Sequence, residues 1–289
     1  LVHRLLEAGH DVAVYNRTRS KTDAVARRGA KVVDAPVDLA EYDVVFTMVS
    51  DSADLTQVIS GEGGLLTHAT AVPSVVIDSS TVSPAASAKA RASAAARGAR
   101  FLAAPVSGNP KVVRAGRLTF AVSGPRDAFD QVQDLLLVLG RGATYLGDGE
   151  VARLAKICHN AFLGVVIQSL AEVTLLAERG GTTRAAFLEF LNDSVLGSTF
   201  TRYKTPALVN LDFTPTFTMP LLNKDFSLAA DAARELAVPM PLASAAAQLV
   251  ASAVGAGHRD LDFATLILEQ ARRSGMTLEP ENVAVDDGL

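Results

Sequence analysis

The chain has no tryptophan and a single cysteine, Cys158. One thiol cannot close a disulfide within the chain, and no group of cysteine and histidine residues has the spacing of a zinc site. We therefore expect no structural disulfide and no bound metal ion. A reducing cytoplasm is the expected location, since disulfides are the mark of oxidising compartments.

The sequence also lacks an excess of positive charge and a long uninterrupted apolar run. Its formal net charge is -4, which does not suggest the concentrated basic face of a nucleic-acid-binding protein. The most apolar stretch, residues 161–177, contains Gln168, Ser169 and Glu172, so it falls short of the roughly 18 uninterrupted apolar residues of a membrane span. We expect a buried helix there, and a small-molecule partner rather than nucleic acid or a membrane.

A third absence concerns the first residues. The chain opens on Leu1 in the middle of an apparent helix, and it contains no Gly-x-Gly-x-x-Gly loop ahead of its first predicted strand. In dinucleotide-binding folds this loop lies at the start of a helix and holds the pyrophosphate. Either the strand and loop precede Leu1 in the natural protein, or the chain is a genuine fragment. The first reading is favoured, because the sheet would otherwise lose its central strand.

From Asp11 to about Leu146, short runs rich in valine and isoleucine alternate with alanine-rich helical stretches. This alternation is typical of βαβ units around a mostly parallel sheet. Strands are predicted over residues 11–16, 43–49, 74–79, 99–106, 118–124 and 143–148. A helix is predicted over residues 83–99, with Ser83 as its N-cap before Pro84. Residues 1–148 are thus expected to form an α/β, Rossmann-like cofactor-binding domain without its first strand.

The pattern changes after Gly149. The stretch from there to the Gly180–Gly181 pair predicts one helix of about 30 residues, and no convincing strand follows it. Residues 149–289 are therefore expected to form an all-α domain for substrate binding and dimerisation. Because the long helix is apolar nearly all round over residues 161–177, we expect burial on every side, within its own domain or in a partner subunit. A homodimer or a dimer-based tetramer is the expected assembly.

The end of the strand over residues 11–16 corresponds to the place where such domains meet the adenosine ribose. NAD enzymes carry an acidic residue there, which binds the 2′-hydroxyl. This chain has Asn16, Arg17 and Thr18, followed by Arg19 and Lys21. The Arg17 guanidinium can pair with a 2′-phosphate through two hydrogen bonds, so NADP is the expected cofactor, with NAD as the alternative. Taken alone, the same residues also suit a solvated basic loop.

Five stretches, in order along the chain, resemble the β-hydroxyacid dehydrogenases, a family that includes 3-hydroxyisobutyrate dehydrogenase, tartronate semialdehyde reductase and glyoxylate reductases. They are LLEAGHDVAVYNRT (5–18), IDSSTVSP (77–84), PVSGN (105–109), GEVARLAKICHNAFLG (149–164) and NKDFSLAADAARELAVPMP (223–241). The resemblance implies an amino-terminal Rossmann domain and a carboxy-terminal helical domain. It also implies hydride transfer between a nicotinamide cofactor and a small β-hydroxy acid or the corresponding semialdehyde or keto acid.

The resemblance assigns roles to individual residues. Lys156 matches the catalytic lysine, which acts as the general acid and base. The positions that match cofactor-binding residues, beside Asn16, Arg17 and Thr18, are Val49, Ser50, Thr81 and Lys224. The positions that match substrate-binding residues, and so would hold a small carboxylate-bearing molecule, are Ser107, Gly108, Asn109 and Asn160.

Lysine suits this chemistry, because it can take a proton from an alcohol and return one to a carbonyl oxygen. We expect desolvation, or the neighbouring positive charge of Arg153, to favour its neutral form. On a helix, Lys156 and Asn160 lie one turn apart on the same face and can meet one ligand. Cys158 faces elsewhere and is expected to be a buried packing residue, and His159 is expected to be hydrogen-bonded rather than to relay protons.

Two departures from the family pattern leave the substrate open. Ala104 stands where an aspartate is frequent, and Asn109 where a second glycine is frequent. Two other functions also stay open. An imine reductase shares this architecture but generally lacks lysine at the position of Lys156. A catalytically silent cofactor-binding or scaffold module is the second alternative.

Overall fold

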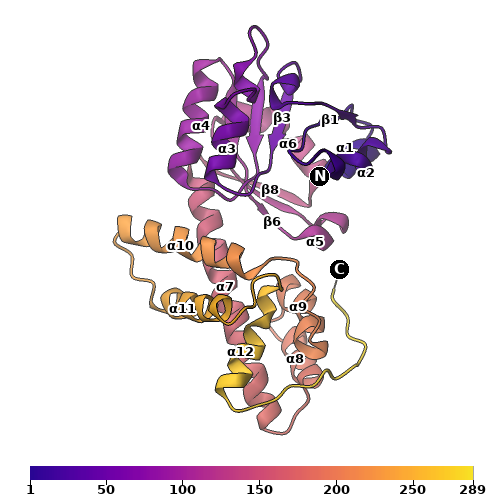
Figure 1. The fold of residues 1–289 in the computed structure, drawn as a ribbon, viewed down its shortest axis with the longest axis vertical. Coiled ribbons are helices and arrows are strands. Elements are labelled where there is room, and N and C mark those ends of the chain that lie inside the picture. Colours follow the sequence, from indigo (N-terminus) through magenta and orange to yellow (C-terminus); the bar gives the residue numbers. More distant parts are fainter. Residues whose placement is uncertain (289) are drawn as a thin grey trace. The chain divides into compact units, whose positions relative to one another are not determined.

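The computed structural model describes residues 1–288. They form two compact units, Leu1–Lys156 (unit 1) and the residues from Ile157 onward (unit 2). Every strand of the described residues lies in unit 1, whereas unit 2 is built from helices (Figure 1). The predicted fold class is therefore confirmed: a Rossmann-like sheet of mainly parallel strands is followed by a helical domain.

Unit 1 is built on a six-stranded sheet in which β3, β4, β5, β7 and β6 are neighbours in that order and β8 pairs with β7. These strands are β3 (Val44–Thr47), β4 (Val75–Asp78), β5 (Arg100–Ala103), β6 (Val106–Ser107), β7 (Thr119–Ser123) and β8 (Gly142–Gly147). Strands β3, β4 and β5 are parallel. Strand β7 runs antiparallel to β5 and β6 and parallel to β8, which the sequence pattern did not predict.

Helices cover both faces of this sheet. Along β4, Val76 packs into the apolar cluster of α3 (Ser52–Ser60) and α4 (Pro84–Ala96), while Val75 and Ile77 pack into the cluster of α6 (Arg126–Leu139). All four residues of β4 are buried, which explains why its sequence shows no polar alternation. Helix α4 begins as predicted, since the Ser83 side chain accepts a hydrogen bond from the Ala86 N–H.

The first 40 residues contain a second, smaller sheet, and their Leu5 and Val12 pack into the core of the main sheet. Strand β1 (Ala13–Val14) pairs with β2 (Lys31–Val32) in a separate parallel two-stranded sheet. Strand β2 was missed, because two residues give no periodic signal. The short helical segments here and in the later loops of unit 1 are α1 (Val2–Glu7), η1 (Arg19–Thr22), α2 (Asp23–Ala26), η2 (Pro36–Leu39), η3 (Leu65–Thr67) and α5 (Pro110–Arg114).

Helix α7 (Val151–Arg179) is the long helix that the sequence predicts. Burial on every side is not reached within the chain itself, since Phe162 is 70% exposed and Leu176 75%. Burial of these side chains in a partner subunit stays a prediction. Cys158 is also exposed, not buried as expected. At 100° per residue these three positions, together with Val173, share one face of the helix, and no helix of the described chain covers that face.

By length and composition α7 could cross a membrane. Half of its most apolar window is buried within the protein, however, as in a core helix. Its buried face contacts α10 (Met219–Glu235) so closely that a Cβ on Gly164 would lie 2.4 Å from Phe226 Cζ. The apolar residues on this face of α7 therefore pack in the core of unit 2.

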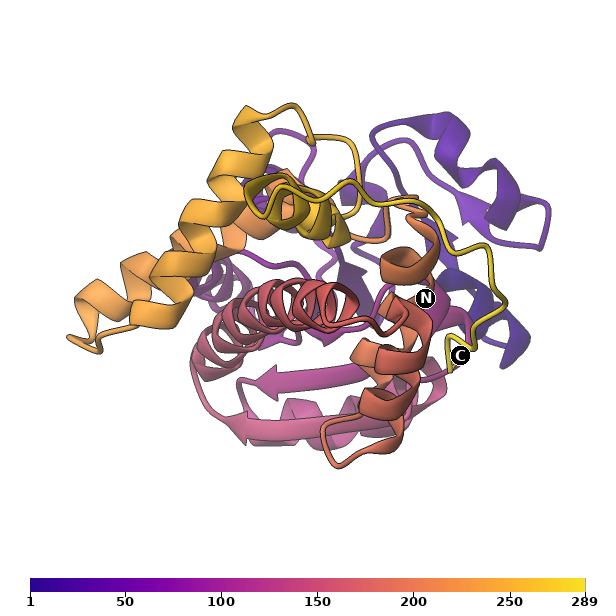
Figure 2. The same ribbon diagram turned by 90° about the horizontal axis from the view of Figure 1, so that it is seen from below.

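The remaining helices of unit 2 pack with α7 and α10 around one apolar core. They are α8 (Arg184–Asp193), α9 (Thr199–Asn210), α11 (Pro241–Gly255), η4 (Phe263–Thr265) and α12 (Leu266–Arg273). Helices α10 and α11 lie side by side, and the extended segment after α12 runs past α9 (Figure 2). The Glu281 carboxylate of this segment accepts hydrogen bonds from the N–H groups of Arg184 and Ala185 at the start of α8.

Candidate functional site

The loops that follow β3 and β4 are joined by hydrogen bonds at the carboxyl ends of these parallel strands. The Val49 N–H donates to Ser80 Oγ over 2.9 Å, and the Ser83 N–H donates to Ser52 Oγ over 3.2 Å. Ser50 lies in the first loop and Thr81 in the second. The structure therefore brings together three of the predicted cofactor-binding positions, at the edge where doubly wound sheets bind their ligands.

The loop after β1 carries the predicted ribose-facing residues. Asn16 Oδ1 accepts a hydrogen bond from the Thr18 N–H over 2.9 Å, which closes a local turn. The Arg17 guanidinium pairs with Asp54, on the first turn of α3, over 2.9 Å. Arg17 thereby links this loop to the start of α3, the helix that follows the Val49 loop. Its side chain is 80% exposed, so it can also reach a ligand.

Ser107, Gly108 and Asn109 form the turn between β6 and α5. Gly108 has a φ of 144°, and a Cβ there would lie 2.7 Å from Val112 Cγ1, so glycine is required. Asn109 caps α5, since its Oδ1 accepts hydrogen bonds from the N–H groups of Lys111 and Val112. The residue that departs from the family pattern thus has a local structural role.

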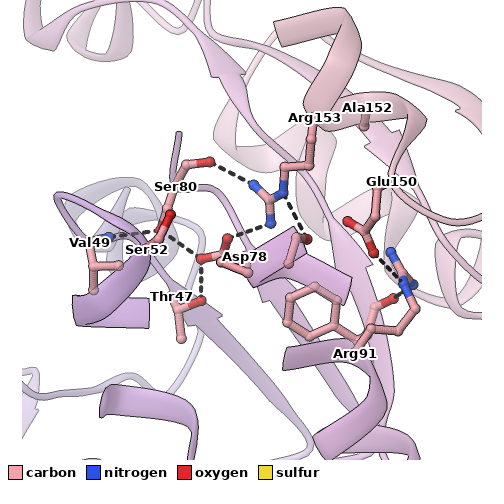
Figure 3. A network of polar contacts seen from close by, with 12 residues as sticks. Thr47, Val49, Ser52, Asp78, Ser80, Arg91, Glu150, Ala152 and Arg153 are labelled. Atoms are coloured by element: carbon pink, nitrogen blue, oxygen red, sulfur yellow. Dashed lines mark hydrogen bonds and ion pairs between the residues drawn. The ribbon is translucent and has the colours of Figure 1, made fainter. Parts of the chain in front are cut away.

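A fully buried carboxylate lies beneath the cofactor loops, at Asp78, the last residue of β4 (Figure 3). Its Oδ1 accepts hydrogen bonds from Thr47 Oγ1 over 2.6 Å and from Ser80 Oγ over 2.7 Å. Its Oδ2 pairs with Arg153 Nη2 over 2.5 Å. The same guanidinium donates from Nη1 to the Ser80 carbonyl oxygen over 2.6 Å, and from Nε to Ser87 Oγ over 3.0 Å.

Arg153 has a partner that the sequence did not reveal. Its positive charge, which we named beside desolvation as a reason for a neutral Lys156, is paired with Asp78, and the side chain is only 1% exposed. Its effect on Lys156 stays a prediction. Burial lowers the pKa of the Arg153 guanidinium from its ordinary value, and the carboxylate of Asp78 opposes this. The pair is a structural feature of unit 1 rather than an isolated positive charge.

The start of α7 is fixed to unit 1 by two further sets of contacts. Arg91 pairs with Glu150 over 2.8 Å (Figure 3). It also donates to the Gly149 carbonyl oxygen over 2.7 Å. The Ser123 hydroxyl donates to the same Gly149 carbonyl oxygen and accepts from the Ala152 N–H. Lys156, which is half-buried, follows one turn later on this anchored helix.

One turn beyond Lys156, Asn160 is only 4% exposed. Its Nδ2 donates to Asp225 Oδ2 over 2.6 Å, and its Oδ1 lies 2.9 Å from His159 Nδ1. Lys224 Nζ lies 3.5 Å from Asp225 Oδ1. In unit 2 the structure thus joins two predicted site residues, Asn160 and Lys224, through a buried carboxylate.

Asp78 and Asp225 were not singled out from the sequence. Both stood within quoted motifs, IDSSTVSP and NKDFSLAADAARELAVPMP, and that membership was the available signal. Each is at most 1% exposed, so each requires a partner. Among residues 1–288, no group of three or more His, Cys, Asp and Glu side chains could hold a metal ion.

Two family models match the chain. A model of the NAD-binding domain of 6-phosphogluconate dehydrogenase matches residues 1–147. A model described as the NAD-binding of NADP-dependent 3-hydroxyisobutyrate dehydrogenase matches residues 147–269. Both carry descriptions of nicotinamide-dependent enzymes, and together they account for most of the chain.

Similar proteins extend over nearly the whole chain. It is 34% identical over 270 residues to an uncharacterized oxidoreductase of Bacillus subtilis, covering 92% of this chain and 94% of that protein. It is 30% identical over 272 residues to the 3-hydroxyisobutyrate dehydrogenase of Pseudomonas aeruginosa, covering 91% of each. The crystal structure of 3-hydroxyisobutyrate dehydrogenase from Salmonella typhimurium is 26% identical, with a TM-score of 0.83 over 93% of this chain and 94% of that one.

Proposed function

The chain belongs to the β-hydroxyacid dehydrogenase family of NAD(P)-dependent oxidoreductases, and we propose that it transfers a hydride between NADP and a small β-hydroxy acid, or the corresponding semialdehyde or keto acid, with Lys156 as the general acid and base. The observation that carries this proposal is the arrangement on α7. Lys156 and Asn160 lie one turn apart, on a helix whose start is held by Arg91, Ser123 and Arg153.

In this proposal the nicotinamide supplies or accepts the hydride, and the chain handles the proton. During reduction the Lys156 ammonium donates a proton to the substrate carbonyl oxygen, and during oxidation the neutral amine accepts it back. Asn160 orients the substrate oxygen. Its amide is held by Asp225 on one side and contacts His159 on the other, so the side chain has one preferred direction.

For the cofactor, the proposal assigns binding to Asn16, Arg17, Thr18, Val49, Ser50, Thr81 and Lys224. The joined loops after β3 and β4 fit a dinucleotide at the carboxyl ends of the strands. No acidic side chain occupies the position that would meet the ribose 2′-hydroxyl, and Arg17 is exposed beside it, which supports NADP over NAD. Asp54 competes with a phosphate for Arg17.

For the substrate, the proposal assigns the turn of Ser107, Gly108 and Asn109 to its carboxylate, with residues 1–148 as the cofactor domain and 149–289 as the substrate and dimerisation domain. A cytoplasmic location and the absence of nucleic-acid and membrane partners belong to the same proposal. The net charge of -4 and the unpaired thiol Cys158 support it.

We further propose that the exposed face of α7 is covered by a second copy of the chain, in a homodimer or a dimer-based tetramer. Phe162 and Leu176 on that face, and Phe190 on α8, are each at least 70% exposed. Large apolar side chains grouped on one helix face are typical of subunit interfaces. Light scattering at micromolar concentration tests this, and a monomer alone would refute it.

The activity test is NADPH oxidation with glyoxylate, succinic semialdehyde and a cyclic imine, by the wild-type protein and Lys156→Ala. We expect turnover of an aldehyde acid, and a loss of at least about 100-fold in Lys156→Ala, because a positioned acid and base typically contributes that much. Retention of more than about a tenth of turnover would show that Lys156 is not the acid and base. Turnover of the imine alone would indicate an imine reductase, and NADPH binding without any turnover would indicate a silent module.

A further inference from the structure

The buried Arg153 guanidinium uses its three nitrogen atoms in three directions. Nη2 bonds the Asp78 carboxylate, Nη1 the Ser80 carbonyl oxygen, and Nε the Ser87 hydroxyl (Figure 3). Ser80 and Ser87 belong to the loop after β4 and to α4, whereas Arg153 lies on the first turn of α7. One side chain therefore joins the start of α7 to the end of β4.

The same carboxylate organises the two cofactor loops. Asp78 Oδ1 holds Thr47 at the end of β3 and Ser80 after β4, and Ser80 Oγ in turn accepts the Val49 N–H. Thr81 directly follows Ser80 in the chain, next to this network of hydrogen bonds. Asp78 thus connects the loops that carry Val49, Ser50 and Thr81 to the helix that carries Lys156.

We propose that Arg153 is a positioning residue, which acts through Asp78 and the Ser80 carbonyl to set the place of Lys156 relative to the cofactor loops. This proposal rests on the proposed function, since it concerns the same acid and base. Lys156 lies three residues after Arg153, so a tilt of the first turn of α7 moves both residues together. Order in the cofactor loops and placement of the Lys156 amine are then coupled through one ion pair.

The contacts require arginine rather than a generic positive charge. Arginine presents a planar fork of fixed donors, whereas the lysine ammonium is a single nitrogen on a flexible stem. Arg153→Lys therefore retains the charge beside Asp78 but cannot bond Asp78, Ser80 and Ser87 at once. A misplacement of about 1 Å at a reacting group can lower turnover by about 100-fold.

The test compares Arg153→Lys with the wild-type protein in four measurements: kcat, the KM of the substrate, NADPH affinity by fluorescence, and the solvent deuterium isotope effect on kcat. We expect kcat to fall by about 10- to 100-fold while NADPH affinity changes by less than about threefold, because Thr47 and Ser80 retain Asp78 as their acceptor. The isotope effect should rise, since proton transfer by a displaced lysine becomes rate-limiting. Unchanged kcat and isotope effect would overturn the proposal.

Arg184→Lys is the matched control. Arg184 is also 1% exposed, pairs with Glu178 over 2.6 Å and donates to the Val209 carbonyl oxygen, but it lies on α8 in unit 2. This variant should lose thermal stability without a change in kcat or in the isotope effect. If kcat falls equally in Arg153→Lys and Arg184→Lys, the role of Arg153 is merely structural and the proposal fails.

A double variant, Asp78→Asn with Arg153→Gln, covers the case in which Arg153→Lys does not fold. It removes both charges together, so no unpaired buried charge remains. We expect a folded protein with low kcat and a raised isotope effect. A folded double variant with wild-type kcat would overturn the proposal, because the ion pair would then be dispensable for placing Lys156.

A separate measurement decides the proposal if the wild-type protein turns over none of the substrates, which would refute the proposed function. Hydrogen–deuterium exchange reports local opening of the backbone. NADPH should protect the amides of residues 151–157 in the wild-type protein and not in Arg153→Lys. Equal protection in both, or none in the wild-type protein, would overturn the coupling.

Discussion

Replacing Asp225 should weaken substrate turnover through Asn160, whose Nδ2 donates to one oxygen of the Asp225 carboxylate. Asn160 Nδ2 lies 2.6 Å from Asp225 Oδ2, and the two side chains are 4% and 1% exposed. A hydrogen bond to a charged group contributes about 1.5–3 kcal/mol, and an unsatisfied buried donor costs a similar amount. A difference of about 1.4 kcal/mol corresponds to a tenfold change in kcat/KM. Two variants can therefore separate the effect of the Asp225 charge from the effect of its acceptor oxygen.

Asp225→Asn retains an acceptor oxygen but removes the charge, so we expect kcat/KM to fall by about tenfold. Asp225→Ala leaves the buried Asn160 amide without its acceptor, so we expect a fall of about 100-fold. In the proposed function Asn160 orients the substrate in the ground state as well as in the transition state, so part of the loss should appear in KM. Steady-state kinetics with the preferred aldehyde acid gives both parameters.

Asp262→Asn provides the control for the loss of a buried charge. Asp262 is also 1% exposed and lies in unit 2, where it pairs with Lys204 over 2.6 Å. That variant should lower the melting temperature and leave kcat/KM of the folded protein unchanged. If Asp225→Ala stays within about threefold of wild-type kcat/KM while folded, Asp225 does not act through Asn160 and the reasoning is refuted.

Two further predictions concern the cofactor and the acid stability. Arg17→Ala should chiefly raise the KM for NADPH, and Asp54→Asn should lower it by releasing the Arg17 guanidinium; equal KM values in all three proteins would contradict this assignment. Hydrogen bonds from Arg272 and then Arg273 lower the pKa of Glu269 from 4.5 to about 2. Its stabilising effect is therefore fully present above pH 4.5 and lost as the pH falls toward 2. Because the arginine partners are partly exposed, Glu269→Gln should lower the free energy of unfolding at pH 7 by only about 1 kcal/mol. Urea unfolding should show the two proteins converging at pH 2, and a constant difference would count against the ion pairs.

The elements with a strong local signal could be predicted from the sequence. Helix α7 was found within two residues at each end, because a glycine pair marks its end and no strand-like alternation interrupts it. Strands β3 and β4 were found through their valine-rich runs. The antiparallel direction of β7 was not, since direction depends on pairing with β5 and β6 rather than on the residues of β7 itself.

In the candidate site, too, the local spacing could be predicted from the sequence and the long-range contacts could not. Lys156 and Asn160 are neighbours on one helix, so their spacing alone predicts a shared face. Asp78 and Arg153 are 75 residues apart, and Asn160 and Asp225 are 65 apart, so these contacts exist only once the chain has folded. The error on Cys158 has the same origin: the angle on the helix was right, but which faces of α7 are covered depends on helices far away in the sequence.

The free-energy cost of burying the Arg153–Asp78 ion pair indicates what the pair contributes to the protein. Removing two charges from water costs several kcal/mol per ion, and well-packed apolar side chains of similar volume are often as stable or more so. Stability alone therefore gives little reason for a guanidinium and a carboxylate at 1% and 0% exposure. Apolar packing cannot fix the orientation of this helix start, because it makes no directional bonds. Three donor bonds from one rigid fork fix how the first turn of α7 lies against the end of β4. A fold that only had to bury this helix start would not need a fixed orientation, whereas the acid and base that we propose three residues further along the helix, Lys156, would need one.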